Sequence, residues 1–465
     1  MSPTKLFGTD GIRGPLNSLA LLPHNMTRLG MILGFMVKNQ RYYPNLPSLE
    51  SSLITIGRDT RSSGLYLESA LTAGISAAGV NCELVGILPT AAVSFQAKLA
   101  QAYFGIVISA SHNPYHDNGI KLFGPDGFKV PHEIEQIIEE EFFSNNLFGK
   151  AIASTPGIII NKPETQINHK NLLINLFNKN SRPLRIVLDC AHGAAFSLAP
   201  AVFAECGFEL RIIGCEPDGQ NINRDFGSEA PHRLKHEVLD FKADIGIAFD
   251  GDADRVIFAD EQGEIIEGDA ILATLAIYFK QQNVLSKNTL VTTIMSSVAL
   301  DNALSPHNIS VVRTPVGDKH VARHMLENGF SFGGENSGHL IMFPLATTGD
   351  GILSALKFIE IIYNSMLPVS KLVSFYKPTP RVLKNITVAT KIPLTLMPLT
   401  SAAINNANNM LNNMGRVLLR YSGTENKARL LVEGSSTHEC QKIADDIAKL
   451  FCTELASQNT HPDPR

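Results

Sequence analysis

The sequence predicts an α/β protein of several domains, with mixed, mostly parallel sheets and a smaller α+β domain at its C-terminal end. Short runs rich in β-branched residues, such as 53–57 and 185–190, alternate with helix-length segments along most of the chain. That alternation is typical of βαβ units and parallel strands. The chain has 465 residues, more than one hydrophobic core usually holds, and domain sizes predict roughly three or four domains.

Breaks in this alternation mark the expected domain boundaries. The polar segment 160–171 is interpreted as a linker that leads into a helix, an acidic turn lies at 261–263, and two prolines interrupt the segment 375–382. After the last break, two predicted strands at 416–422 and 427–434 are joined by a tight turn, which is typical of a small α+β domain. These breaks predict domains over 1–160, 161–262, 263–376 and 377–465.

The composition excludes several classes of protein. The chain carries 40 basic and 44 acidic side chains, a net charge of −4, and non-specific binding to nucleic acid needs a basic surface instead. The apolar helix expected near 29–37 is far shorter than the roughly 20 residues that cross a bilayer, and no apolar leader is visible at the N-terminus. Six cysteines without C-x-x-C spacing are expected to be reduced thiols in a cytoplasmic protein.

The first candidate for chemistry is a serine turn. An apolar strand is expected at 104–108, and Ser109, Ser111, His112 and Asn113 follow it directly. Ligand sites of open α/β sheets form at the carboxyl ends of strands. A serine hydrolase is not favoured because the G-x-S-x-G pattern is absent. An ordinary polar turn is the alternative interpretation of these residues alone.

The second candidate is an acidic loop. Asp250, Asp252 and Asp254 alternate after an apolar strand, and carboxylates this close repel one another unless a cation lies among them. Oxygen ligands suit Mg²⁺ or Ca²⁺. An EF-hand is not favoured because a strand precedes the loop and Arg255 stands where the sharp turn needs glycine. The three carboxylates leave room for a further ligand such as a phosphate oxygen, and a solvated acidic turn is the alternative.

The third candidate is the glycine-rich segment 333–339. Glu335 and Ser337 lie two residues apart, so in an extended loop their side chains project the same way. A carboxylate beside a hydroxyl can bind neighbouring hydroxyls of a sugar, and the flanking glycines allow close approach of a ligand. A plain glycine-rich turn is the alternative.

The fourth candidate is a cluster of anion-binding groups near the C-terminus. Arg420 ends a predicted strand, and Ser422, Gly423 and Thr424 follow it, with Arg429 nearby in the sequence. Backbone N–H groups of small residues can form an anion nest, to which hydroxyls and arginines add donors. The G-x-x-x-x-G-K-[ST] pattern is absent, so a P-loop is excluded. A hairpin turn with an exposed arginine is the alternative.

Taken together, these motifs resemble the four signature loops of the α-D-phosphohexomutase superfamily. The residues that carry the resemblance are "SASHNP" (109–114), "DGDADR" (250–255), "GENSGH" (334–339) and "RYSGTE" (420–425). Further segments are similar to the bacterial branch that acts on glucosamine phosphates: 5–14, 57–64, 214–223, 316–321 and 347–352. The resemblance extends from residue 5 to the C-terminal helix.

The resemblance implies four domains around a central cleft, three of them α/β with a shared core, and it assigns roles to residues. Ser111 is implied to be a phosphoserine, and one Mg²⁺ per chain is implied to bind Ser111, Asp250, Asp252 and Asp254. The other implied roles are catalysis for Arg13, His112 and Lys121, substrate binding for Arg255, Lys319, Glu335, Ser337 and His339, and phosphate binding for Arg420, Ser422, Gly423, Thr424 and Arg429.

The implied reaction interconverts glucosamine 6-phosphate and glucosamine 1-phosphate through a 1,6-bisphosphate, on the route to UDP-N-acetylglucosamine. A hexosamine or glucose 1,6-bisphosphate is implied as activator, and a homodimer is implied as the assembly. Three positions depart from the pattern of the branch: Asn426 replaces a usual proline, Lys319-His320 replaces Arg-Tyr, and Ala253 replaces a frequent glycine.

Three different functions remain open on the sequence. The same chemistry can serve glucose or mannose phosphate, since no residue that senses the amino group can be named. A sugar-bisphosphate phosphatase would pass the serine's phosphate to water, and a non-catalytic sugar-phosphate binding protein would keep the site without turnover. The sequence does not choose between Lys121 and His112 as the group that handles the proton.

Overall fold

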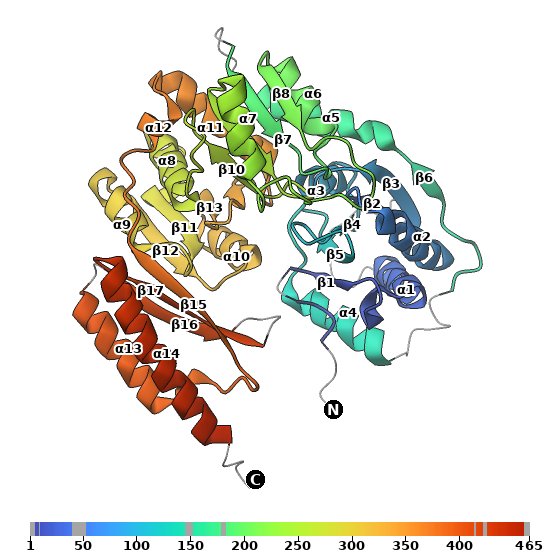
Figure 1. Cartoon of the computed structure of the whole chain (residues 1–465). Coiled ribbons are helices and arrows are strands. Elements are labelled where there is room, and N and C mark those ends of the chain that lie inside the picture. Colours follow the sequence, from blue (N-terminus) through green and yellow to red (C-terminus); the bar gives the residue numbers. More distant parts are fainter. Residues whose placement is uncertain are drawn as a thin grey trace. The chain divides into compact units, whose positions relative to one another are not determined.

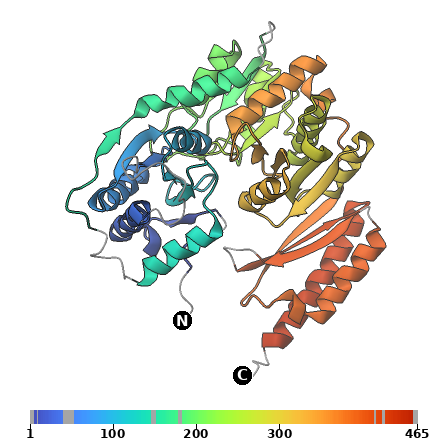
Figure 2. The same ribbon diagram turned by 180° about the vertical axis from the view of Figure 1, so that it is seen from behind.

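The computed structural model describes residues 5–8, 10–39, 53–144, 152–177, 183–412, 415–421 and 426–459 (Figures 1 and 2). By their contacts the residues form two compact units, one of residues 1–295 and 311–374 and the other of residues 296–310 and 375–465. The first unit holds three α/β sheets, and the second holds one antiparallel sheet.

The first sheet presents the serine turn. Its six strands lie in the order β1 (Ile12–Pro15), β5 (Asp117–Phe123), β4 (Phe104–Ile108), β2 (Leu53–Arg58), β3 (Asn81–Ile87) and β6 (Ile159–Asn161). Strands β4, β2, β3 and β6 run parallel to one another, while β5 is antiparallel to both of its neighbours, β4 and β1. The helices of this part are α1 (Pro23–Asn39), α2 (Ser62–Ala77), α3 (Thr90–Leu99) and α4 (His132–Ser144).

The crossovers of this sheet place helices on both faces. The chain passes from β2 through α2 to β3, and then returns through α3 to β4 on the other side of β2. Because parallel crossovers are right-handed, reversing the direction puts α3 on the face opposite α2, as Figure 1 shows. Strand β4 is therefore covered on both sides, and all five of its residues are buried.

The second and third sheets repeat this plan on a smaller scale. The second has the order β10 (Val256–Ala259), β9 (Ile245–Phe249), β7 (Arg185–Asp189) and β8 (Glu209–Ile213), and the third β12 (Ser310–Thr314), β11 (Thr289–Thr293), β13 (Phe332–Gly334) and β14 (Leu340–Met342). Their helices are α5 (Gln166–Leu176), α6 (Leu198–Glu205), α7 (His232–Phe241), α8 (Gly268–Gln281), α10 (Asp318–Asn328), α11 (Gly351–Ser365) and α12 (Val369–Leu372).

Both of these sheets combine parallel pairs with an antiparallel edge. β7 pairs in parallel with β8 and β9, and β11 pairs in parallel with β13, whereas β10 and β14 are antiparallel to their neighbours. The acidic loop leaves the carboxyl end of β9, a fully buried strand. The mixed, mostly parallel α/β architecture predicted from the sequence is confirmed.

The second unit is the small α+β domain that the sequence predicts, joined by one helix from the middle of the chain. Its sheet has the antiparallel order β15 (Arg381–Thr387), β17 (Lys427–Glu433) and β16 (Arg416–Tyr421). Helices α13 (Pro398–Leu411) and α14 (Thr437–Asn459) pack side by side against this sheet (Figures 1 and 2). The pairing of β16 with β17 confirms the predicted pair of strands.

The added helix is α9 (Val298–Leu304), which belongs to the second unit by contacts that the sequence does not reveal. The backbone N–H of Val298, at its first turn, donates to Glu433 Oε2 at 3.3 Å. Arg416 donates to the carbonyl oxygen of Ser296 at 2.6 Å and forms an ion pair with Glu433 at 2.7 Å. These contacts tie α9 to the C-terminal sheet.

One local expectation is wrong. The polar segment 160–171 is not wholly a linker, because Ile159–Asn161 forms β6 and pairs in parallel with β3 along the edge of the first sheet. A helix does form there, α5, but it begins at Gln166, inside the segment expected to be the linker. Among the described residues, no helix is long and apolar enough to cross a membrane.

Candidate active site

Ser111 lies in a tight turn at the carboxyl end of β4. The turn is fixed locally, since the N–H of Ser111 donates to Ser109 Oγ at 2.9 Å and the N–H of Asn113 donates to the carbonyl of Ala110 at 3.1 Å. Ser111 has a φ of 52°, a left-handed conformation that is uncommon for a residue with a side chain. Its hydroxyl is buried and donates to Asp250 Oδ2 at 2.5 Å.

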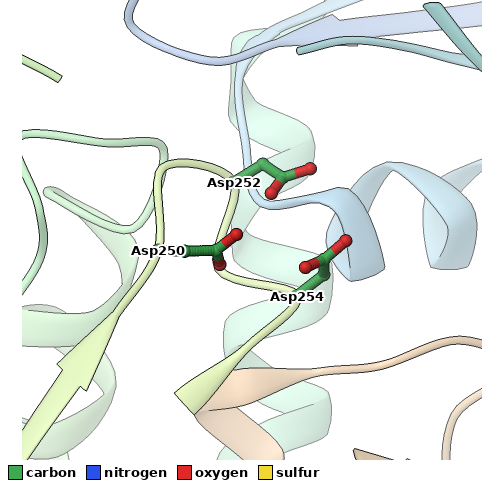
Figure 3. A group of neighbouring side chains, drawn as sticks. All are labelled: Asp250, Asp252 and Asp254. Carbon is green, nitrogen blue, oxygen red and sulfur yellow. The ribbon is translucent and has the colours of Figure 1, made fainter. Parts of the chain in front are cut away.

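The three aspartates of the acidic loop converge on one point. Asp250, Asp252 and Asp254 are all buried, and one carboxylate oxygen from each lies within 4.8 Å of the others. Figure 3 shows the three side chains leaving one loop with their oxygen atoms facing a common space. The loop is anchored to the first sheet's helix α3, where Thr90 Oγ1 donates to Asp252 Oδ2 at 2.5 Å.

Lys121 brings positive charge to this acidic cluster. It lies on β5, and its side chain is buried with Nζ 2.8 Å from Asp252 Oδ2 and 2.6 Å from Asp254 Oδ2. Burial by itself lowers the pKa of Lys121, but the carboxylates of Asp10, Asp252 and Asp254 outweigh it and hold the pKa well above its ordinary value. Lys121 is therefore a cation at neutral pH.

The donor set fits a divalent metal ion. Asp252 Oδ1 is buried and accepts no hydrogen bond among the described residues, and a buried carboxylate oxygen without a partner is costly. Burial, together with Asp254 and Asp252, raises the pKa of Asp250 well above its ordinary value. A cation among the three would relieve this repulsion, and hard oxygen donors are the ligands that Mg²⁺ prefers.

His112 and Arg255 border the serine hydroxyl. His112 Nδ1 lies 3.4 Å from Ser111 Oγ. Burial and the nearby Arg255 lower the pKa of His112 to about 4, so its imidazole is neutral at pH 7. The charge of Arg255 is kept by Asp254 and Asp250, which outweigh its burial and raise its pKa, and its guanidinium lies 3.7 Å from Glu229.

Arg13 is held beside the same cluster from β1. Its guanidinium pairs with Asp10 Oδ2 at 2.8 Å, and Arg13 faces Gly119 across the antiparallel pair of β1 and β5. Asp10 in turn lies 3.4 Å from Lys121 Nζ. The structure thus brings Arg13, Lys121 and the acidic loop together through Asp10.

The glycine-rich segment of the third sheet is a tight turn, so the expectation of an extended loop is wrong. The N–H of Gly338 donates to the carbonyl of Glu335 at 3.0 Å, and the N–H of Glu335 donates to the carbonyl of His339 at 2.8 Å. Glu335 Oε1 accepts from the N–H of Gly317 at 3.0 Å, while Ser337 is half-buried in the turn. Alternation of side chains is a property of extended backbone, which this segment does not have.

His339 joins the acidic cluster, but Lys319 does not. His339 Nδ1 lies 3.5 Å from Asp254 Oδ1, and its Nε2 lies 3.3 Å from Asp318 Oδ2. Lys319 Nζ instead contacts Glu135 Oε2 of helix α4 at 3.4 Å. Of these two predicted substrate-binding side chains, His339 contacts the acidic loop at Asp254 and Lys319 contacts Glu135.

Asp10, Lys129 and Asp318 belong to the site although sequence reasoning missed them. Lys129 Nζ forms ion pairs with Asp10 and, at 2.5 Å, with Asp318 Oδ2. Asp10 also contacts Lys121, and Asp318 also contacts His339. Asp10 and Asp318 lie within the segments 5–14 and 316–321 that carry the resemblance. Their position as charged residues inside those segments could have marked Asp10 and Asp318 as candidates. Lys129 lies outside every motif, so the sequence offered no comparable signal for it.

The predicted phosphate-binding residues belong to the second unit. Arg420 and Arg429 stand directly opposite one another in the antiparallel pair of β16 and β17, so their side chains leave the same face of the sheet. Ser422, Gly423 and Thr424 lie outside the described residues. Two adjacent guanidinium groups favour an anion as their ligand.

A cavity of about 530 Å³ lies elsewhere, beside helix α7 of the second sheet. His192, Phe226 and Arg233 contribute to its walls, and none of the predicted site residues does. The chemistry therefore coincides with the buried charged cluster and not with this cavity.

Comparisons with known proteins agree with the arrangement along the whole chain. The family models for phosphoglucomutase/phosphomannomutase match in order: alpha/beta/alpha domain I over residues 4–148, domain II over 166–263, domain III over 267–379, and the C-terminal domain over 383–450.

Curated relatives and solved structures are similar over nearly full length. A phosphoglucosamine mutase of Citrifermentans bemidjiense is 42% identical over 98% of this chain and 99% of its own, and one of Sorangium cellulosum is 43% identical over 97% and 94%. A phosphoglucomutase/phosphomannomutase family protein of Burkholderia thailandensis is similar in structure, with a TM-score of 0.81, 23% identity and coverage of 97% of both chains. The structural likeness supports the same fold.

Proposed function

The chain belongs to the phosphoglucomutase/phosphomannomutase family and is an isomerase of the phosphohexomutase type, and from that premise we propose how it acts and on what. It interconverts glucosamine 6-phosphate and glucosamine 1-phosphate through a phosphoserine enzyme and a 1,6-bisphosphate intermediate. The choice of the amino sugar is supported by the curated phosphoglucosamine mutases that are 42% and 43% identical over nearly full length.

One observation carries the catalytic part of the proposal. The buried hydroxyl of Ser111 donates to Asp250, and Lys121 contacts the neighbouring Asp252 and Asp254. A serine held against a cluster of carboxylates and one buried cation fits a group that carries phosphate, because phosphoryl transfer depends on positioning and on neutralising charge at the phosphate oxygens.

In the forward direction, phosphate moves from Ser111 to the free C1 hydroxyl of glucosamine 6-phosphate. The bond between phosphorus and Ser111 Oγ breaks, the bond between phosphorus and the sugar oxygen forms, and the serine oxygen keeps the electron pair of the broken bond. The proton of the attacking hydroxyl goes to His112, whose Nδ1 lies 3.4 Å from Ser111 Oγ. The bisphosphate then presents its C6 phosphate, and Ser111 Oγ bonds to that phosphorus as the bond between phosphorus and the C6 oxygen breaks. The C6 oxygen takes the proton held by His112, and glucosamine 1-phosphate leaves.

Ser111 in its phosphorylated form, Asp250, Asp252 and Asp254 would hold one Mg²⁺, as the convergence of the three carboxylates and the buried Asp252 Oδ1, which accepts no hydrogen bond among the described residues, support. Bound there, Mg²⁺ would supply neutralisation of phosphate charge. Lys121 adds a fixed positive charge beside Asp252 and Asp254. A phosphoserine carries close to two negative charges at neutral pH, so Mg²⁺ and Lys121 would together neutralise that charge.

Other residues bind the parts of the substrate that do not react. Arg420 and Arg429, with Ser422, Gly423 and Thr424, bind the distal phosphate, and Glu335, Ser337 and His339 bind sugar hydroxyls. Arg255 and Lys319 complete the substrate-binding set. Because the bisphosphate presents each end in turn, these contacts have to accept two orientations of the sugar.

The test compares glucosamine 6-phosphate, glucose 6-phosphate and mannose 6-phosphate in one preparation with Mg²⁺ and a 1,6-bisphosphate activator. We expect kcat/KM for the amino sugar to exceed the others by about a hundredfold or more, which corresponds to about 2.7 kcal/mol of discrimination in the transition state. Equal or better use of glucose or mannose phosphate would refute the amino-sugar assignment.

The same assay distinguishes a mutase from a phosphatase and from a binding protein. Net release of inorganic phosphate at the rate of turnover would indicate a sugar-bisphosphate phosphatase. Absence of both turnover and phosphate on Ser111 would indicate a sugar-phosphate binding protein. Three further statements stay predictions. Sedimentation tests the homodimer, and cell fractionation tests the cytoplasmic location. Coupling the product to an enzyme that makes UDP-N-acetylglucosamine from it tests the supply of that synthesis.

A further inference from the structure

Two backbone carbonyl groups of the serine turn are held from two different sheets. Arg61 Nη2 donates to the carbonyl oxygens of Ser111, at 3.2 Å, and of Asn113, at 2.5 Å. Asn223 Nδ2 donates to the same two oxygens, at 2.8 Å and 3.0 Å. Each of these NH2 groups has two hydrogens, so four hydrogen bonds converge on two carbonyl groups.

Arg61 approaches from the first sheet and is fixed in place. It follows β2 in the segment 57–64, its side chain is only 1% exposed, and it forms a buried ion pair with Asp59. The N–H of Arg61 also donates to Asp59 Oδ1 at 2.9 Å. A guanidinium held this way has little freedom, so the position of its Nη2 is set before the turn contacts it.

Asn223 approaches from the second sheet, in the segment 214–223. The two segments touch directly, since the N–H of Ser62 donates to the carbonyl of Gly219 at 2.9 Å. Asn223 has a φ of 59°, a conformation that asparagine tolerates better than most residues. Its amide must present nitrogen to the turn, because its oxygen would face two carbonyl oxygens.

The acidic loop leaves space for this contact at Gly251. A Cβ atom at Gly251 would lie 2.6 Å from the carbonyl oxygen of Ser111 and 2.9 Å from Asn223 Nδ2. Those separations are too short for any side chain. The serine turn, the acidic loop and Asn223 are therefore packed against one another at the backbone of Ser111.

These contacts compensate for an unfavourable backbone conformation. The left-handed conformation of Ser111 is unfavourable for a residue with a side chain, and such strain persists only where surrounding groups impose it. The same conformation points Ser111 Oγ at Asp250. The donors that fix these carbonyl groups, Arg61 and Asn223, therefore also fix the direction of the Ser111 hydroxyl.

We propose that Arg61 and Asn223 are positioning residues that lock the backbone of Ser111 from two domains and thereby aim the phosphoserine at the substrate hydroxyl. The inference rests on the proposed function, because aiming matters only if Ser111 carries the phosphate. It gives a role to the segments 57–64 and 214–223, which neither the metal ligands nor the substrate contacts explain.

The test replaces Asn223 by Asp and by Gly in the full chain. Asp keeps the shape and loses the N–H donors, while Gly keeps the left-handed backbone and removes the side chain. The matched control is Asn221, which is also half-buried. Its side-chain amide forms hydrogen bonds within its own segment: Nδ2 donates to the carbonyl oxygen of Glu216, and Oδ1 accepts from the N–H of Asp218, both at 2.9 Å. Asn221→Asp and Asn221→Gly make the same two changes there.

We expect both Asn223 variants to lose about 10- to 100-fold in kcat, the effect of a misplacement on the order of 1 Å, with KM nearly unchanged. In protein phosphorylated with glucose 1,6-bisphosphate, the ³¹P resonance of the phosphoserine should move toward that of free phosphoserine. The Asn221 variants should keep the kcat and the resonance of the natural protein.

Arg61→Lys provides a second test, because lysine keeps the charge and loses the fixed fork that contacts both carbonyls. It should show the same fall in kcat with an unchanged KM.

Four outcomes would overturn the proposal: normal kcat in both Asn223 variants, a raised KM with normal kcat, an equal loss in the Asn221 controls, or failure of both Asn223 variants to fold. The last would assign Asn223 to stability. Absence of turnover in the natural protein would instead reject the proposed function.

Discussion

At the scale of single residues, Ser111 has the sharpest expected effect. Ser111→Ala should reduce turnover to background, because the variant has no oxygen to carry the phosphoryl group. Binding of the sugar phosphate should persist, since the residues assigned to the distal phosphate and the sugar are unchanged. Steady-state kinetics and titration calorimetry with glucosamine 6-phosphate check both statements. Near-normal activity in the variant would exclude a phosphoserine mechanism.

Ala253 gives a test of backbone conformation in the acidic loop. It has a φ of 54° and is buried, and glycine adopts this left-handed conformation with the least steric cost. Ala253→Gly should change the free energy of unfolding by less than about 1 kcal/mol, because relief of about 1–2 kcal/mol of strain is offset by glycine's entropy in the unfolded chain and by a lost buried methyl group.

Ala253→Val is the contrasting variant. A β-branched residue is a strong outlier at positive φ, so thermal unfolding should show a clear loss of stability together with loss of activity. Equal stability of the valine and glycine variants would contradict the left-handed conformation of residue 253.

Residue chemistry was predictable where one short segment held it. The strand that precedes Ser111 and the alternation of Asp250, Asp252 and Asp254 were visible in the sequence, and the structure brings those four together. Asp10 and Asp318 were not singled out, because a lone carboxylate in a motif has no pattern of its own. Their role depends on Lys129, which reaches both from a different part of the chain.

At the scale of elements, helix α13 is capped by a residue from helix α14. Glu454 accepts from the N–H groups of Leu399, at 3.0 Å, and Thr400, at 2.8 Å, and from Thr400 Oγ1 at 2.6 Å. These N–H groups belong to the first turn of α13, which has no intrahelical acceptor for them. A carboxylate there also interacts favourably with the helix dipole.

Glu454→Gln should therefore weaken the start of α13 by about 1 kcal/mol at pH 7, equal to roughly fivefold faster hydrogen exchange of the Leu399 and Thr400 amides. Burial raises the pKa of Glu454, but the hydrogen bonds from Thr400 and Leu399 outweigh it and lower the pKa. A lowered carboxylate pKa adds stability above the ordinary glutamate value of about 4.3, and that stability is lost as the pH falls through the lower folded-state value.

The difference in exchange between the natural protein and Glu454→Gln should accordingly be full at pH 7 and shrink below about pH 4. Exchange followed by mass spectrometry at both pH values measures it. Exposed Asp446 on the same helix, replaced by Asn, is the control and should leave both amides unaffected. A difference that grows on acidification would contradict the assignment.

Elements with strong periodicity were predictable, and short ones at edges were not. The buried runs of β4 and β9 signal strands through their apolar, β-branched residues. Strand β6 has three exposed residues and polar neighbours, so nothing in its composition separates it from a linker. The turn at 335–338 is set by hydrogen bonds to His339 and by Glu335 bonding to Gly317, which a pattern of glycines does not specify.

At the scale of the whole molecule, Lys129 joins segments that are far apart along the chain. Asp10 precedes β1 of the first sheet, Asp318 begins α10 of the third, and Lys129 contacts both. Removing one partner of a buried ion pair costs roughly 3–5 kcal/mol. The side chain of Asp10 is 27% exposed, so Lys129→Met should cost less, about 2 kcal/mol.

A fall of a few degrees in Tm for Lys129→Met would report that cost. Lys98→Met, at the exposed end of α3, is the control for loss of a lysine and should leave Tm nearly unchanged. A Tm equal to that of the natural protein in both variants would show that the bridge does not stabilise the first unit.

The fold of the whole molecule was predictable in its repeated α/β plan, since each repeat carries the same local pattern of strands and helices. The sequence alone did not show which segments of different repeats contact one another. The hydrogen bonds from Arg61 and Asn223 to the serine turn join residues 50 to 112 positions apart in the sequence. The periodicity of apolar residues predicts local helices and strands, but it does not predict contacts between residues so far apart in the sequence.

The attachment of α9 to the C-terminal sheet has a practical consequence for dissecting the protein genetically. A gene truncated after residue 374 would encode α9 but not Glu433 or Arg416, which bind Val298 and Ser296. In that fragment the backbone N–H of Val298 and the carbonyl oxygen of Ser296 would have lost these partners, so the start of α9 would be less firmly held. A chimaera with a relative should therefore exchange residues 296–310 and residues 375–465 together, because both segments belong to the second unit.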